Sequence, residues 1–250
     1  MIRIAACGDI HAGRDCAGRI APWFADVDRL ADVLLLAGDL TRTGDPAEAA
    51  LLASELRAVT VPKIAVLGNH DYHDERPEVL VDILRHGGID VLEGEPTSVE
   101  VGGLRLGVAG AKGFAGGFAG ACAPAFGEPE MKAFVRHTQQ MAVRLESALL
   151  ELDADLRVAL LHYAPVTDTL AGERLDLYPL LGSYLLGDAI DRAGADLVLH
   201  GHAHAGSELG RTPGGVPVRN VAQTVLRAPY RVYAMAADGS LRSPSDVGAI

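Results

Sequence analysis

The chain has 250 residues, of which 49% are hydrophobic and 22% are charged. This length and apolar content suit one α/β domain over residues 1–250. The 33 acidic and 22 basic residues give a net charge of −11, which argues against binding to duplex nucleic acid. Because apolar runs are shorter than the roughly 18 residues of a membrane helix and the start turns polar too early for a signal peptide, we expect a cytoplasmic protein without a membrane partner.

Short apolar runs alternate with helical segments along the chain. Short continuous apolar runs, here of three to six residues, are typical of strands that are buried on both faces. Such strands are predicted at 2–7, 33–37, 64–67, 158–161 and 197–199. Helices are predicted at about 46–58, 77–86, 129–152 and 183–193. This alternation predicts a mostly parallel sheet.

The remaining segments predict antiparallel additions to that sheet. Gly102-Gly103 joins two segments, 97–101 and 104–109, which are expected to form a hairpin. Later strands are expected at 216–221 and 231–236, and the chain after about 237 is expected to be frayed. The glycine-rich piece 110–120 is predicted to be a flexible loop near a site.

Polar side chains follow each of the five buried strands, in most cases directly after a glycine. Ligands of open α/β sheets bind beyond the carboxyl ends of the strands, so we expect these side chains to converge. Two carboxylates, several imidazoles and an amide suit divalent ions such as Mn, Fe, Zn or Mg. A carboxylate can bridge two ions about 3.5–4 Å apart, the arrangement that hydrolyses phosphoesters. The candidate side chains are Asp9, His11, Asp39, Asn69, His70, Asp71, His162, His202 and His204.

These residues stand in motifs that resemble the calcineurin-like metallophosphoesterase superfamily. In order, the motifs are Gly8-Asp9-Ile10-His11, Gly38-Asp39, Gly68-Asn69-His70-Asp71, His162 and Gly201-His202-Ala203-His204. The resemblance covers residues 8–204 and implies an α/β fold in which a two-sheet β-sandwich is flanked by helices. It also implies two divalent metal ions, with Mn or an Fe/Mn pair favoured.

The resemblance implies a role for each residue. Asp9, His11, Asp39 and His204 are expected to hold one ion. Asp39, Asn69, His162 and His202 are expected to hold the other, with Asp39 as the bridge. Water activated by the ions would attack phosphorus in line. His70 would protonate the leaving oxygen and Asp71 would orient it, although a loop-capping role for Asp71 is equally compatible with the sequence.

Details of the motifs narrow the expected substrate. Protein phosphatases of the superfamily carry Asp-Arg-Gly after the second motif and Glu after the Asn-His pair, whereas this chain has Asp39-Leu40-Thr41 and Asp71. The motifs look more like the class III cyclic nucleotide phosphodiesterases, with Gly8 in place of a frequent Ser. We therefore expect a small-molecule phosphodiester substrate. A phosphomonoesterase and a catalytically silent metal-binding scaffold for a protein partner are the alternatives.

The sequence context also predicts roles for several residues outside the motifs. Candidate substrate contacts are His73, Lys112 and Tyr163. Phe114 and Phe118 are expected either in a lid over the site or in a loop packed on itself. His200 is expected to be a satisfied core residue or a support for a ligand. Surface positions are expected for His86 and His137, and a buried thiol for Cys7.

Overall fold

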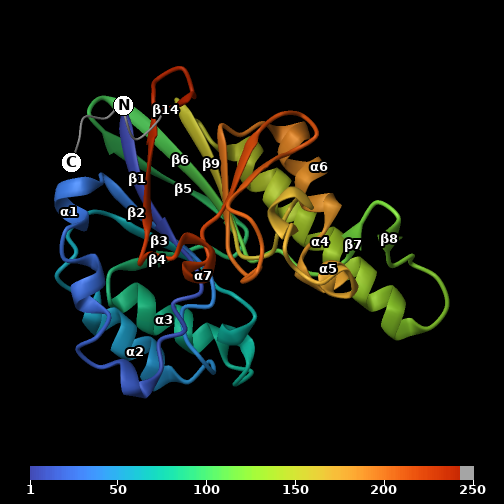
Figure 1. The fold of residues 1–250 in the computed structure, drawn as a ribbon, viewed down its shortest axis with the longest axis horizontal. Coiled ribbons are helices and arrows are strands. Elements are labelled where there is room, and N and C mark those ends of the chain that lie inside the picture. The colour runs from blue at the N-terminus through green and yellow to red at the C-terminus, as the bar shows by residue number, and fades with distance from the viewer. Residues whose placement is uncertain (243–250) are drawn as a thin grey trace.

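The computed structural model describes residues 1–242, in which two six-stranded sheets lie face to face between helical layers (Figure 1). Helices α1 (Val27–Leu30), α2 (Pro46–Glu55) and α3 (Pro77–His86) lie on one side of the sandwich. Helices α4 (Pro129–Glu151) and α6 (Tyr184–Ala193) lie on the other side. The predicted α/β sandwich flanked by helices is confirmed.

The first sheet has the strand order β14-β13-β1-β2-β3-β4. Strands β1 to β4 are parallel, and β13 pairs with β1 in the antiparallel direction. All parallel strands therefore direct their carboxyl ends to one edge. The strands are β1 (Ile2–Cys7), β2 (Val33–Ala37), β3 (Lys63–Val66), β4 (Ile89–Val91), β13 (Arg231–Met235) and β14 (Leu241–Arg242).

The second sheet has the strand order β11-β12-β10-β9-β6-β5. Its four central strands are parallel, and the antiparallel strands β5 and β11 form the two edges. The predicted hairpin corresponds to β5 and β6. The strands are β5 (Glu95–Val101), β6 (Leu104–Ala111), β9 (Leu156–Leu161), β10 (Leu197–His200), β11 (Leu209–Arg211) and β12 (Pro217–Asn220).

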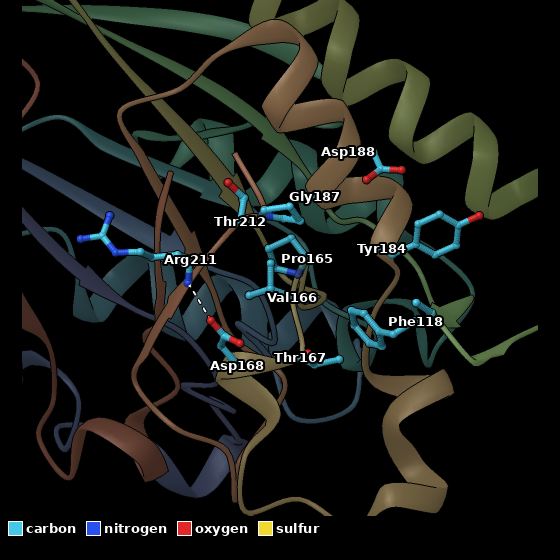
Figure 2. A pocket seen from close by; sticks show the side chains of 12 residues that line it. Phe118, Pro165, Val166, Thr167, Asp168, Tyr184, Gly187, Asp188, Arg211 and Thr212 are labelled. Atoms are coloured by element: carbon cyan, nitrogen blue, oxygen red, sulfur yellow. Dashed lines mark hydrogen bonds between the residues drawn. The ribbon is translucent and has the colours of Figure 1, made fainter. Parts of the chain in front are cut away.

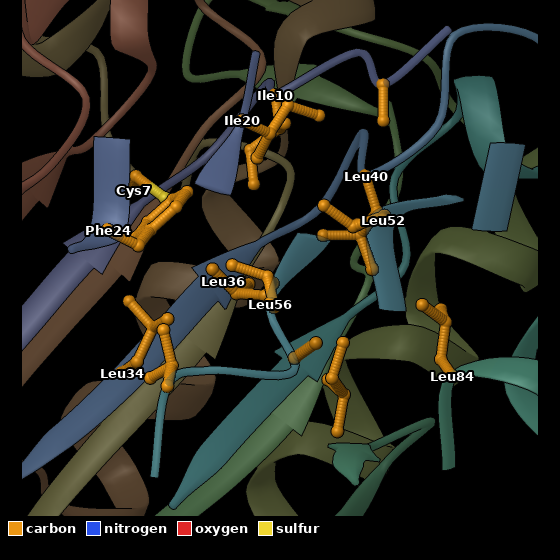
Figure 3. Close-up of a cluster of buried hydrophobic side chains, with 14 of the residues drawn as sticks. Cys7, Ile10, Ile20, Phe24, Leu34, Leu36, Leu40, Leu52, Leu56 and Leu84 are labelled. Atoms are coloured by element: carbon orange, nitrogen blue, oxygen red, sulfur yellow. The ribbon is translucent and has the colours of Figure 1, made fainter. Parts of the chain in front are cut away.

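The alternation of side chains along each strand explains why both faces of both sheets are apolar. In β1, Ile4 and Ala6 face the layer between the sheets, whereas Ala5 and Cys7 pack with α2 and α3 on the outer face. The outer cluster is shown in Figure 3. In β9, Leu160 lies between the sheets and Leu161 packs beneath α4 and α6. Three apolar layers thus separate four layers of secondary structure.

The helix boundaries follow local signals. The Asp45 side chain accepts a hydrogen bond from the Ala47 amide at 2.9 Å and caps α2, with Pro46 in the first position. Ser183 caps α6 in the same way, through the Leu185 amide. Helix α2 ends at Glu55, three residues earlier than predicted, and the chain turns at Leu56.

Shorter elements complete the described chain. The two-residue strands β7 (Gly117–Phe118) and β8 (Ala121–Cys122) form a separate hairpin, and α5 (Tyr178–Leu181) and α7 (Gln223–Leu226) are single turns. Turns of 3-10 helix lie at Arg14–Cys16, Ala21–Phe24, His70–Tyr72, Asp168–Leu170 and Leu175–Leu177.

Two sequence predictions need correction. The glycine-rich piece is not wholly a loop, because β6 continues to Ala111 and β7 follows at Gly117. The chain after 237 was expected to be frayed, yet β14 pairs with β13 through Ala234 and Arg242. The rest of that predicted tail, 243–250, lies outside the described residues.

Candidate metal centre

The predicted ligands meet where strands of both sheets end. Asp9 and Asp39 follow β1 and β2, and His162 and His202 follow β9 and β10. The backbone is unusual here: of the six non-glycine residues with positive φ in residues 1–242, four are predicted ligands. They are Asp9 (φ 61°), His11 (φ 47°), Asp39 (φ 49°) and His202 (φ 70°). Such strained backbone is concentrated at functional sites in proteins.

Glycines in the motifs make room for the ligands. A Cβ on Gly38 would lie 2.5 Å from Nδ1 of His162, and Gly38 also has φ of +81°. A Cβ on Gly68 would lie 2.1 Å from Oδ1 of Asp39 and 2.2 Å from its backbone nitrogen. Because no side chain fits at these distances, each glycine lets a neighbouring loop approach a ligand closely.

One group of donor atoms comes from Asp9, His11, Asp39 and His204, whose ligand atoms all lie within 4.8 Å of one another. Nε2 of His204 is 2.8 Å from Oδ1 of Asp9, and this hydrogen bond raises the pKa of His204. The Asp9 carboxylate also accepts the His202 backbone amide at 3.0 Å and 3.1 Å. This is the first ligand set that the resemblance implies.

The second group comes from Asp39, His162 and His202, again with donor atoms within 4.8 Å. Nε2 of His162 lies 3.3 Å from Oδ1 of Asp39 and 2.9 Å from Oδ1 of Asn69. Asn69 therefore joins this group, and Asp39 belongs to both groups. The structure brings together all seven predicted ligands.

The donor set fits two cations. Nε2 of His11 is buried and has no hydrogen-bond partner within the described residues, so an unpartnered ring nitrogen lies 3.7 Å from Oδ2 of Asp39. Nδ1 of His162 is 2.9 Å from the Ala37 carbonyl, which can only accept a hydrogen bond, so this nitrogen carries the proton of the neutral ring. Nε2 then has its lone pair available to bind a metal ion. Burial lowers the pKa of His202 to about 3, which favours the neutral form that metals bind.

Asp71 holds loops together rather than orienting His70. Its buried carboxylate accepts hydrogen bonds from the amides of Leu40, Thr41 and Gly68 and from the Thr41 hydroxyl, at 2.6–3.1 Å. Burial raises its pKa to about 6. The loops after β2 and β3 are joined through this one side chain. Of the two roles considered from the sequence, the hydrogen bonds support loop capping.

His70 is positioned by other groups. Its Nδ1 lies 2.8 Å from the Arg42 carbonyl, and its backbone amide donates to Oδ1 of Asp39 at 2.9 Å. Nε2 is 3.9 Å from Oδ2 of Asp39, and the side chain is 40% exposed. The imidazole thus lies beside the donor groups and is open to a substrate.

The other histidines divide into three kinds. His200 is a satisfied core residue, as expected: Nδ1 contacts the Gly201 carbonyl and Nε2 the Thr169 hydroxyl, both at 2.8 Å, and burial lowers its pKa to about 4. His73 and His86 are exposed. His137 was expected at the surface, but it is partly buried and packs edge-on against the Phe114 ring, with ring centroids 4.5 Å apart.

A cavity of about 370 Å³ adjoins the metal centre through Asn69 and Tyr163. We call it the Lys112 cavity, after the predicted substrate contact that lines it. Sequence reasoning missed four of its other lining residues, Tyr72, Glu93, His137 and Arg144. The sequence gives little indication that these four residues lie together. Only the spacing of His137 and Arg144 is informative, because it places those two on one face of a helix. Which face meets the site depends on packing.

The segment around Phe118 does not reach this cavity. Phe118 is buried against Leu170 and Leu181, so the expectation of a self-packed loop holds for it. It lines a separate cavity of about 470 Å³ with Tyr184, Asp188 and Arg211 (Figure 2). There the Arg211 amide donates to the Asp168 carboxylate at 3.2 Å.

Comparisons with known proteins bear on the family and the fold. Residues 2–206 match the model of the calcineurin-like phosphoesterase family. The structure resembles that of phosphopantetheinyl hydrolase from Mycobacterium tuberculosis, with a TM-score of 0.67 and 17% identity over 92% of this chain and 94% of that one. A putative 5′-nucleotidase from Staphylococcus aureus has a TM-score of 0.58 and 19% identity over 96% of this chain and 52% of that one.

At such identities the likeness shows a shared fold. Among curated proteins, no sequence matches the chain. Within residues 1–242, none of the helices is both long enough and apolar enough to pass through a bilayer. The cytoplasmic location stays a prediction.

Proposed function

Since the chain belongs to the calcineurin-like phosphoesterase family, we propose that it hydrolyses phosphoester bonds at the metal centre described above. The observation that carries the proposal is the shared carboxylate: Asp39 contributes to both donor groups. A shared ligand is what a pair of closely spaced ions requires. Two bound divalent ions would activate water for attack on phosphorus and would stabilise the charge that develops on its oxygens.

The residues of the chain itself supply position and proton transfer. The Ala37 carbonyl holds the His162 ring in one tautomer, and the Gly68 amide holds Asp71 and with it the loop of Asn69. His70 is the proposed general acid. In the protonated imidazole Nδ1 stays bonded to the Arg42 carbonyl, and Nε2 is free to donate to the leaving oxygen.

The general-acid proposal predicts a dependence on the leaving group. His70→Ala should lower kcat/KM about 100-fold or more for an alkyl ester, whose alkoxide needs a proton. The same change should cost a nitrophenyl ester much less, because nitrophenolate leaves without one. His86→Ala, which removes an exposed histidine at the end of α3, is the control. Equal losses for both esters would assign His70 to another role.

For the substrate class, we propose a small-molecule phosphodiester such as a cyclic nucleotide. Support comes from the motifs and from the Lys112 cavity, whose aromatic lining could cover an organic ester group beside Asn69. A phosphomonoester is the alternative, and the similar structures are named for a phosphopantetheinyl hydrolase and a putative 5′-nucleotidase.

A hydrolysis assay in Mn²⁺ with matched nitrophenyl phosphodiester and phosphomonoester substrates tests the proposal. Preferred diester turnover that is abolished in Asp39→Ala is the expected result. Preferred monoester turnover would instead identify a phosphatase. Two bound ions without turnover of either ester, or of a panel of cyclic nucleotides, would contradict the proposal and favour the metal-binding scaffold.

A further inference from the structure

We propose that the Lys112 cavity binds a second anionic group of the substrate, through the Lys112 ammonium with the Arg144 guanidinium at its margin. This inference rests on the proposed function, because it concerns the part of the ester beyond the scissile phosphorus. The ligand would be a phosphoester whose organic portion carries a further phosphate or carboxylate. The cavity shares Asn69 and Tyr163 with the surroundings of the metal centre, so one molecule can reach both.

The ammonium of Lys112 is held in an aromatic cage. Its Nζ lies 4.8 Å from the ring centroid of Tyr72, 5.1 Å from that of Phe114 and 5.3 Å from that of Tyr163. Aromatic faces attract a cation but accept no strong hydrogen bond from it. Within residues 1–242, the Nζ has neither an ion-pair nor a hydrogen-bond partner. Its three N–H donors are therefore available to an anion that enters the cavity.

The acidic residue of the cavity does not neutralise this charge through a direct contact. Glu93 accepts hydrogen bonds from the Tyr72 hydroxyl, at 3.2 Å to each carboxylate oxygen. Burial, which is the largest cause, raises the pKa of Glu93 and so disfavours its charged form. By formal charge the lining carries Lys112 and Arg144 against Glu93. Burial lowers the pKa of Lys112 to about 8, so the ammonium form still predominates at pH 7.

The opposite wall adds a second cation. Helix α4 contributes His137, Met141 and Arg144 to the cavity. The stem of Arg144 faces Gly94, where an added Cβ would lie 3.2 Å from its Cβ and Cδ. Burial lowers the pKa of His137, and the charges of Lys112 and Arg144 lower it further. Within residues 1–242, the Arg144 guanidinium has no ion-pair partner.

These features select the chemistry of the ligand. The Tyr163 ring offers apolar surface close to both sites: its centroid is 4.4 Å from that of His202 and 5.3 Å from Nζ of Lys112. The expected ligand carries one phosphorus group at the metal centre, an apolar spacer along the rings and a second anion at Lys112. A charge-assisted hydrogen bond to a partly buried ammonium gives specificity for that anion over a neutral polar group of the same shape.

Binding of simple substrate mimics tests the inference. The probes are ω-carboxyalkyl phosphonates of increasing chain length and the matching ω-carboxamides, titrated calorimetrically into the Mn²⁺-loaded protein. At the best length the carboxylate should bind about tenfold or more tightly than the amide. Lys112→Met, which keeps an unbranched apolar stem among the three rings but removes the ammonium, should reduce this ratio to near one.

Matched variants exclude a general effect of charge. Lys132→Met removes an exposed lysine of α4, and Arg136→Met removes an exposed arginine of the same helix. Both should leave the carboxylate preference intact, whereas Arg144→Met should lower it severalfold. If Lys112→Met fails to fold, the carboxylate preference of Arg144→Met is compared with that of Arg136→Met, and a loss in the first variant alone would support the inference. Equal binding of carboxylate and amide at every length in the unaltered protein would overturn the inference.

The result is separable from that of the hydrolysis assay. Turnover of a nitrophenyl ester without any carboxylate preference would support the proposed function and contradict the second-anion site. A carboxylate preference that depends on Lys112, without turnover of any ester, would support the anion site and contradict the hydrolase proposal.

Discussion

At the residue scale, the candidate metal centre depends on glycines that leave room for the ligands and on a carboxylate that satisfies backbone amides around them. Gly38 and Gly68 leave room that a Cβ would occupy, and Asp71 accepts four hydrogen bonds from two loops. The ligand types could be predicted from the sequence because each motif is local. The partners of Asp71 could not, since Thr41 lies 30 residues away from it.

Gly68→Ala should damage the centre by steric conflict. Its Cβ would stand 2.2 Å from the backbone nitrogen of Asp39, so the loop must shift. We expect a loss of about 1–3 kcal/mol in the free energy of unfolding and weaker Mn²⁺ binding, measured by denaturant titration and calorimetry. Gly13→Ala is the control, because its Cβ would meet only the flexible guanidinium of Arg42. Equal effects of the two changes would refute the steric explanation.

Asp71→Asn should separate the two loops that carry Asp39 and Asn69. The amide would present N–H donors to backbone donors in a buried place, at a cost of about 1–3 kcal/mol in the free energy of unfolding. Mn²⁺ affinity should fall as well, although Asp71 is not a ligand. Asp82→Asn, on the exposed face of α3, should change neither quantity. Loss of activity with stability and metal affinity unchanged would instead support a direct catalytic role.

At the element scale, two glutamates of α2 accept hydrogen bonds from the loops that follow β1 and β2, the strands that precede Asp9 and Asp39. Glu48 accepts hydrogen bonds from the amides of Arg42 and Thr43, at 3.0 Å and 2.8 Å. Glu55 accepts the amides of Gly18, Ile20 and Ala21, at 2.7–3.0 Å. The helix was predictable from its cap and proline, but these long-range contacts depend on how α2 packs on the sheet.

The contribution of Glu55 should depend on pH. The amides of Ala21, Gly18 and Ile20 lower its pKa in the folded protein, against the effect of burial. Its stabilisation is therefore fully present above the unfolded pKa of about 4.3 and is lost as the pH falls through the lower folded value. Glu55→Gln should lower Tm by a few degrees at pH 7, and the difference should shrink in acid.

Calorimetric scans at several pH values check this expectation. Glu151→Gln, at the exposed end of α4, should keep Tm within about a degree or two of the parent at every pH. A Tm difference for Glu55→Gln that persists unchanged at pH 2 would show that the charge of Glu55 is not the cause.

At the scale of the whole molecule, the centre lies across both sheets. Asp9, Asp39 and Asn69 follow strands of the first sheet, and His162 and His202 follow strands of the second. The sheets also share one apolar layer, which includes Ile4, Leu35 and Leu160. Bound metal would therefore join elements that already pack together, and we expect metal binding and sheet packing to stabilise the chain in one unfolding transition.

Removal of metal should lower the stability of the whole chain. Mn²⁺ at a hundred times its Kd contributes about 2.7 kcal/mol, so Tm should rise by roughly 5–10 °C over the chelated protein. Calorimetry should show one transition in both states. A metal-dependent shift that is also seen in Asp39→Ala would place the stabilising ion elsewhere, and two separate transitions would contradict the single domain.

The sequence by itself determined the strands buried on both faces, the main helices and the seven candidate ligands, because periodicity, caps and glycine-polar motifs are encoded over a few residues. Tertiary structure decided the lining of the Lys112 cavity, the partners of Asp71 and the burial of His137. Tyr72, Lys112 and Arg144 line one cavity only because the loop after β3, the end of β6 and one face of α4 pack together. Such contacts depend on the orientation of whole elements, which no local pattern specifies.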